Sequence, residues 1–177
     1  MAAQDIAVAL ERTQSVLRRR PSFGLHDDAP ALARWDGGVR MVASHADGYQ
    51  IATDLPVELG GAGDQVSPGW LMRAGLASCT ATCIVMAAAA AGLELDALKV
   101  RTSSRSDIRA LLGVDDADGS DVYPGPRDLR MVVRISARGA SPARLRALVE
   151  EAGRVTPTLA AIQHACPVDI RVEVETA

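Results

Sequence analysis

The sequence has 177 residues, of which 48% are hydrophobic and 23% are charged, and its formal net charge is −3. This length suits one domain with a substantial core and is short for two. The acidic balance argues against nucleic-acid binding, which needs clustered basic residues. Three cysteines are too few for a structural disulfide framework.

The N-terminal segment predicts an amphipathic helix that ends before Pro21. Ile6, Leu10 and Leu17 share one face at helical spacing, and charged residues occupy the remainder. Acidic residues near the start, and the lack of a continuous apolar run, do not fit a secretory signal. We therefore expect a cytoplasmic protein.

The next segments predict a hairpin and then one long helix. Val39–Ser44 and Tyr49–Leu55 read as strands around a turn at 46–48, and a glycine-rich stretch follows. Ser67 and Pro68 have the form of an N-cap and a first helical residue, and the helix should run to Ala91. Its residues are apolar or small on nearly every side, so we expect it to be buried on most faces. Its hydrophobicity is too low to favour a membrane span.

The C-terminal half predicts two further strands, Leu98–Arg105 and Leu129–Ala137, separated by a loop at 113–128. Helices should start at Ser141-Pro142 and at Thr156-Pro157, and Val168–Val174 should form the last strand. Asp116–Asp121 superficially resembles a calcium loop, but Arg127 stands where the closing glutamate is needed, so we expect a surface hairpin. These elements define an α+β fold.

The cysteines suggest thiol redox chemistry. Cys79 lies about twelve residues into the long predicted helix, and Cys166 opens a Cys-Pro pair before the last predicted strand. Because Cys79 lies beyond the first helical turn, its thiolate needs another stabilising group, most simply an arginine. Cys83 shares the helical face of Cys79, with Cβ atoms about 5–6 Å apart. A disulfide needs about 3.5–4.5 Å, so Cys83 is a poor partner while the helix is intact.

Four segments of the chain resemble the OsmC/Ohr family of thiol-dependent hydroperoxide reductases. They are Leu59–Pro68, Leu71–Cys79, Gly92–Leu98 and His164–Val168, and the match spans most of Asp36–Val174. The resemblance implies an OsmC-like domain over 31–177 in which antiparallel sheets pack around a long central helix, after a helical extension over 1–30. It also implies an intertwined homodimer with active sites at the subunit interface.

The resemblance further implies roles for individual residues. Cys79 would attack the peroxide of an organic hydroperoxide, and Cys166 would resolve the resulting sulfenic acid as a disulfide. A dithiol or lipoyl-type reductant would then reopen that bond, with no cofactor and no metal. Arg40 is the closest counterpart of the arginine that stabilises the thiolate in this family, and Arg34 is the second choice.

One departure from the family concerns the residue after the helix-opening proline. Hydroperoxide reductases usually have a glutamate there that holds the catalytic arginine, and this chain has Gly69. Without that carboxylate the guanidinium loses a bidentate partner. Glu58 could supply a carboxylate from the preceding loop, and Trp70 could shape the peroxide pocket. The alternative function is a non-catalytic OsmC-like protein that binds small molecules or responds to stress, and an arginine distant from Cys79 would favour it.

Three other interpretations of the same residues stay open. Cys79 could be a buried and inert helix cysteine. A zinc site could combine Cys79, Cys83, His164 and Cys166, although their spacing is not that of structural zinc motifs. His164 could act as a base for Cys79, but no strand-turn-helix elbow surrounds the cysteine, so we expect a solvent-facing histidine.

Overall fold

The computed structural model describes residues 2–175 and has the predicted α+β architecture. In chain order the helices and strands are α1 (Ala3–Arg19), β1 (Leu32–Trp35), β2 (Met41–Ser44), β3 (Gln50–Thr53), α2 (Pro68–Ala90), β4 (Leu95–Arg105), α3 (Ile108–Leu112), β5 (Arg127–Ala137), α4 (Pro142–Arg154) and α5 (Pro157–Gln163). Short 3₁₀ turns occupy Pro21–Gly24 and Val57–Leu59. The strands form two antiparallel sheets, one in the order β1-β2-β3 and one of β4 and β5.

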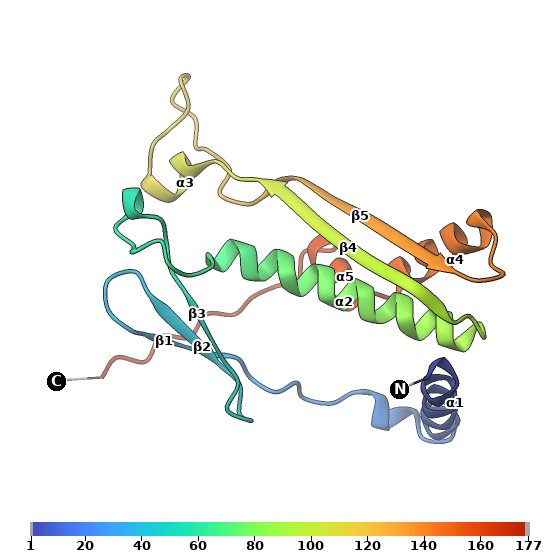
Figure 1. Cartoon of the computed structure of the whole chain (residues 1–177). Helices are drawn as coiled ribbons and strands as arrows, with labels where there is room; N and C mark the ends of the chain where they lie inside the picture. Colours follow the sequence, from blue (N-terminus) through green and yellow to red (C-terminus); the bar gives the residue numbers. More distant parts are fainter. Residues whose placement is uncertain (1, 176–177) are drawn as a thin grey trace.

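Helix α2 runs along the length of the molecule, and the other elements are arranged beside it (Figure 1). The hairpin of β4 and β5 runs along one side of it, and α4 and α5 pack against it as well. The three-stranded sheet lies near the start of α2, and α1 crosses near its end. The half-buried residues Ile6, Leu10 and Leu17 confirm the predicted apolar face of α1.

The ends of α2 follow from local sequence. The Ser67 hydroxyl accepts a hydrogen bond from the Trp70 backbone N–H at 3.2 Å, and Pro68 is the first helical residue. At the other end Gly92 adopts a φ of +66°, and the next N–H, from Leu93, donates to the Ala88 carbonyl at 2.8 Å. This helix is long and apolar enough, by length and composition alone, to cross a membrane. A helix packed within a protein can meet the same criterion.

The core lies where the last turns of α2 meet the hairpin and α4. Ala88, Leu93 and Leu145 are buried together. Leu95, Ile135 and Leu148 pack against them from the hairpin and from α4. Apolar side chains of β4 and β5 alternate with exposed polar ones, which places one face of the hairpin on α2 and the other in solvent.

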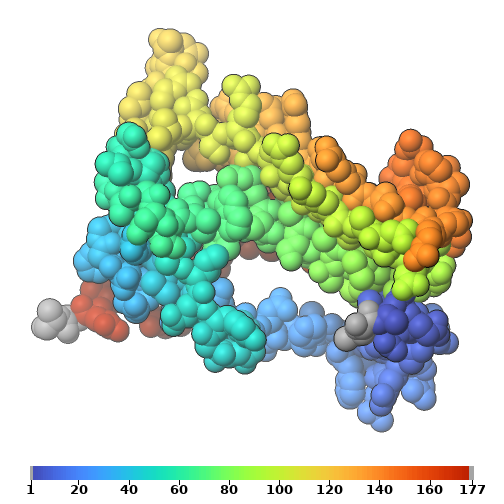
Figure 2. Space-filling model, viewed as in Figure 1, coloured from blue at the N-terminus to red at the C-terminus, as the bar shows by residue number. Residues whose placement is uncertain are grey.

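The expectation that α2 is buried on most faces is wrong for the single chain. Only Leu76, Thr80, Ile84, Ala88 and Ala89 are buried along it. Figure 2 shows why: one flank of α2 borders an open gap between the three-stranded sheet and α1. Helix α2 therefore has a side of small and apolar residues that no element within residues 2–175 covers.

The predicted last strand, Val168–Val174, is also wrong for the single chain. Residues 164–175 form no helix or strand, and the side chains of Val168, Ile170, Val172 and Val174 are 77–85% exposed. The alternating pattern is real, but the segment pairs with neither sheet of its own chain. Conversely, β1 was not predicted from the sequence, because Leu32–Trp35 is short and exposed on both faces.

Candidate thiol site

Cys79 is half-buried on α2, on the side where α5 packs. Helix α5 follows α4 almost without a loop, because Thr156 and Pro157 start a new helix directly after α4 ends at Arg154. Thr156 is fully buried, and its hydroxyl donates to the Ala152 carbonyl at 2.8 Å. This contact fixes the start of α5 beside the middle of α2.

Thr158 is the residue that α5 brings to Cys79. Hydrogen bonding from the Thr158 hydroxyl, and then from its backbone N–H, lowers the pKa of the Cys79 thiol, and a smaller contribution comes from Cys83. The Thr158 hydroxyl is buried and has no fully formed hydrogen bond to any residue in the range 2–175. A thiolate is a better acceptor than a thiol, so ionisation of Cys79 would satisfy this hydroxyl.

Cys166 is a free, exposed thiol that follows the far end of α5. The seven residues of α5 separate its two ends by roughly 10 Å. A disulfide needs Cα atoms about 4.4–6.8 Å apart. Because Cys79 contacts the beginning of α5, a Cys79–Cys166 bond requires the segment after this helix to fold back. Cys83 is a free, half-buried thiol on the same helix.

Arg40 is held by two carboxylates. Its guanidinium donates to Asp54 at 3.0 Å and also pairs with Asp64, and these contacts raise its pKa. The Asp54 side chain is buried and also accepts from the N–H groups of Ala62, at 3.0 Å, and Leu55, at 2.8 Å. The Ala62 N–H first, then Arg40, lower the pKa of Asp54. Arg40, which lies directly before β2, thus links the three-stranded sheet to the glycine-rich loop.

The glycine-rich loop closes around Asp54 at Gly61. A Cβ atom at this position would lie 1.8 Å from the Leu55 carbonyl oxygen and 2.7 Å from the Asp54 carboxylate. Only glycine permits so close an approach. The Leu59–Pro68 segment therefore folds around the buried carboxylate of Asp54, which pairs with Arg40.

The other residues considered for the arginine site lie apart from this cluster. Arg34 is exposed and pairs with Asp36 at 2.9 Å. A Cβ atom at Gly69 would lie 3.6 Å from the Arg73 guanidinium, so a side chain fits there. Asp54 and Asp64, not Glu58, supply the carboxylates to Arg40. The sequence patterns single out neither carboxylate: Asp54 lies within the predicted strand Tyr49–Leu55, and Asp64 follows the last glycine of the glycine-rich stretch.

The proposed zinc ligands do not come together. Within residues 2–175, no three His, Cys, Asp or Glu side chains are arranged to hold a metal ion. His164 is exposed and directly follows the last residue of α5. Most of the length of this helix separates it from Thr158, which lies at the start of α5. The site is thus one thiol on a long helix, with hydroxyl and amide donors from a second helix.

Two antiparallel sheets, a long helix bearing a thiol and a conformationally tight glycine-rich loop define a protein of the OsmC-like class. The chain belongs to the family of OsmC-like proteins, whose model matches residues 61–171. No curated protein matches the chain in sequence.

Solved structures share the fold at low sequence identity. An OsmC-like protein from Mycoplasma pneumoniae superimposes with a TM-score of 0.65 at 17% identity, over 80% of this chain and 91% of that one. An OsmC-like protein of unknown function from Vibrio cholerae gives 0.61 at 13% identity, over 77% and 94%. An organic hydroperoxide resistance protein from Legionella pneumophila gives 0.54 at 22% identity, over 78% and 93%.

Proposed function

We propose that this protein is a thiol-dependent peroxidase that reduces organic hydroperoxides through Cys79. The observation that carries the proposal is the buried Thr158 hydroxyl, which has no hydrogen-bond partner among residues 2–175 and lies on the helix that packs on α2. Together with its backbone N–H, this hydroxyl lowers the pKa of the Cys79 thiol. Family membership supports it, because the OsmC-like fold includes proteins named for organic hydroperoxide resistance. The apolar surface of α2 around the thiol favours an organic peroxide over hydrogen peroxide.

The proposed first step transfers one oxygen atom. The Cys79 thiolate attacks the terminal peroxide oxygen, the O–O bond breaks, and the alkoxide leaves and takes a proton to become an alcohol. Sulfur is oxidised to a sulfenic acid while the peroxide is reduced. Thr158 stabilises the thiolate before attack. We assign Arg40 as the cation of the peroxide site, because it lies directly before β2, where the resemblance places the arginine of this family.

The proposed second step uses Cys166. Its thiol condenses with the Cys79 sulfenic acid, the S–S bond forms, and water leaves. Among residues 2–175, the exposed segment 165–175 pairs with neither sheet, so it is free to fold back over α5. A dithiol or lipoyl-type reductant then restores both thiols by exchange and is itself oxidised to a disulfide. No cofactor or metal enters this cycle.

We propose that the active unit is a homodimer in the cytoplasm. The chain exposes 13567 Å² of surface, whereas a folded monomer of its mass exposes about 8200 Å². Exposed apolar side chains include those of the alternating segment 168–174 and residues along α2 such as Trp70, Met72 and Met86. We take the partner to be a second copy of the chain, as the resemblance to the OsmC/Ohr family implies.

A specific observation favours the alternative, a non-catalytic OsmC-like protein that binds small molecules or acts in a stress response. The cation assigned to the thiolate, Arg40, is already neutralised by Asp54 and Asp64. A guanidinium held by two carboxylates has little charge left for a thiolate or a peroxide. Gly69 also stands where the hydroperoxide reductases usually have a glutamate, so that carboxylate is missing from the site.

Peroxide consumption in the presence of a dithiol separates the two functions. The wild type should consume an organic hydroperoxide at a steady rate, and Cys79→Ser should reduce that rate to the uncatalysed level. Cys166→Ser should retain the first turnover and lose most of the later ones. Equal and negligible rates in the wild type and Cys79→Ser would reject the peroxidase and favour the binding function.

A further inference from the structure

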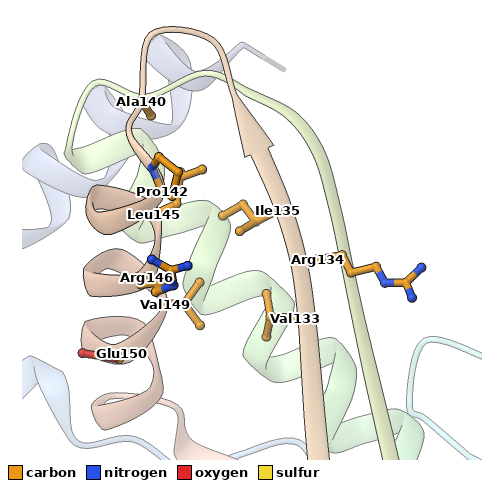
Figure 3. A pocket seen from close by; sticks show the side chains of 9 residues that line it. All are labelled: Val133, Arg134, Ile135, Ala140, Pro142, Leu145, Arg146, Val149 and Glu150. Carbon is orange, nitrogen blue, oxygen red and sulfur yellow. The ribbon is translucent and has the colours of Figure 1, made fainter.

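The exposed face of the β4–β5 hairpin carries a cluster of basic side chains that the thiol site does not use. We call Lys99, Arg101, Arg130 and Arg134 the basic face. All four are exposed, and they alternate with apolar residues that face α2. Figure 3 shows this division on β5, where Arg134 points to the opposite side of the sheet from Val133 and Ile135.

The register of the hairpin brings these cations together. Lys99 lies directly opposite Arg134. Arg101 lies opposite Val132, so Arg130 and Arg134 are its two diagonal neighbours, about 7–8 Å away. A hollow of about 240 Å³ opens among Lys99, Arg101, Val132 and Arg134. The hollow is floored by Val132 and the aliphatic stems of the basic side chains.

No carboxylate balances this charge. The ion pairs of the hairpin lie at its two ends, Arg105 with Asp128 at 3.6 Å and Arg138 with Asp96 at 3.2 Å. Between those ends, no ion pair forms with any residue of the described part of the chain, 2–175. Like charges directly opposite on a sheet destabilise it. The arrangement costs stability, in a protein whose net charge is −3, and binding of an anion would offset that cost.

We propose that the basic face is a binding site for a compact polyvalent phosphate anion of the oligophosphate class. Arginine forks match phosphate oxygens in bidentate pairs, and three cations around one hollow, with Arg130 diagonal to Arg101, match an anion with several charges better than a single phosphate. The face bears no aromatic side chain on which a nucleobase could stack, which disfavours single-stranded nucleic acid. It also lacks the large apolar residues that enter a membrane surface.

The second copy proposed above does not account for this surface. A subunit interface formed here would desolvate four cations, which is unfavourable unless each gains a carboxylate partner. The apolar side of α2 and the segment 168–174 are the surfaces that gain by being covered. The proposal is thus independent of the peroxidase and of the dimer.

Thermal unfolding without ligand tests the electrostatic cost. At low ionic strength Lys99→Gln should raise the unfolding temperature by about 1–3 °C, because it relieves the repulsion with Arg134. The gain should vanish at high salt. Arg12→Gln, an exposed charge change on α1, is the control and should give no gain. Destabilisation by Lys99→Gln would overturn the claim that this pair is strained.

Titration with inorganic tripolyphosphate at about 150 mM salt tests the binding itself. The wild type and Arg12→Gln should bind one anion per chain with equal affinity, and Lys99→Gln/Arg134→Gln should bind it about tenfold or more weakly. Adenosine triphosphate should bind like tripolyphosphate if the phosphate chain alone is recognised; a gain of about tenfold would assign a nucleotide as its source.

Three outcomes would overturn the proposal. The first is the absence of saturable tripolyphosphate binding at that ionic strength, and the second is equal binding by the double variant. The third is displacement of tripolyphosphate by a single-stranded oligonucleotide of equal charge at far lower concentration, which would assign the face to nucleic acid. A double variant that stays folded and keeps the oligomeric state of the wild type ensures that these results report on the site.

Discussion

At the residue scale, the reactivity of Cys79 depends on which donors reach its sulfur. The first turn of α2 is too far away to contribute, because Cys79 is the twelfth residue of the helix. Thr158 takes this role from a neighbouring helix, with a side-chain and a backbone donor. A thiol with a lowered pKa gains thiolate at a given pH, and only the thiolate attacks a peroxide.

Removing the Thr158 hydroxyl should therefore raise the pKa of Cys79. In Thr158→Val the pH profile of thiol alkylation should shift to higher pH, and alkylation near neutral pH should slow several-fold. The measurement is the rate of iodoacetamide labelling at Cys79 in a Cys83→Ser/Cys166→Ser background. Thr158→Ser keeps the hydroxyl and serves as the control. An unchanged profile in Thr158→Val would mean that the hydroxyl does not stabilise the thiolate.

Sequence patterns identified the thiol but not its surroundings. Cys79 was found because it interrupts a long run of small and apolar residues. Thr158 was missed because it acts on a residue far away in the sequence, and Asp54 because its role depends on how the following loop folds back onto it. Neither residue stands in a recognisable motif. The predicted partner of the thiolate, Arg40, is placed by the structure against Asp54 and Asp64. The pairing of Cys79 with Cys166 stays a prediction.

At the element scale, the start of α2 has room for the residue that the hydroperoxide reductases usually carry. Gly69 is the second residue of α2, and its neighbours leave space for a side chain. A carboxylate there would face the unpaired N–H groups of the first turn. Arg73, four residues later, would be its helical neighbour.

Gly69→Glu should therefore stabilise the protein by about 1 kcal/mol, from helix propensity, the helix dipole and the pair with Arg73. Chemical denaturation at low salt measures the change. Gly69→Ala should give only the propensity part of the gain, and the difference between the two variants should shrink at high salt. A Gly69→Glu protein less stable than the wild type would contradict the geometry described for this turn.

Elements with strong local signals were predicted well. The bounds of α2 followed from Ser67, Pro68 and Gly92, and the long strands β4 and β5 from their alternation. Segment 168–174 has equally clear alternation but no strand neighbour in its own chain. Alternation predicts that a segment can form a strand. It does not specify which neighbouring strand, in the same chain or in another, the segment pairs with.

At the scale of the whole molecule, the open shape of the chain predicts assembly. Helix α2 is uncovered on one side, and segment 168–174 presents an apolar edge to solvent. Ile170→Glu/Val172→Glu should convert a dimer into a monomer and lower its unfolding temperature, because charges would replace buried apolar contacts. Analytical ultracentrifugation measures the mass. Arg171→Gln, on the alternate side of the segment, should remain dimeric.

A wild type that sediments as a monomer at micromolar concentration would contradict the proposed dimer. Equal assembly of the double variant and Arg171→Gln would contradict the role assigned to segment 168–174. In either case the excess surface of the chain would need a different partner. An intact dimer would instead bring two copies of α2, and hence two Cys79 thiols, into one assembly.

Intact-protein mass spectrometry after one equivalent of organic hydroperoxide shows whether the Cys79 sulfur takes the peroxide oxygen. The wild type should lose two hydrogen atoms as the Cys79–Cys166 disulfide forms. Cys166→Ser should instead gain one oxygen atom, which a sulfenic-acid reagent should trap at Cys79. A wild-type protein whose mass does not change, or oxidation that persists in Cys79→Ser, would contradict this oxygen transfer.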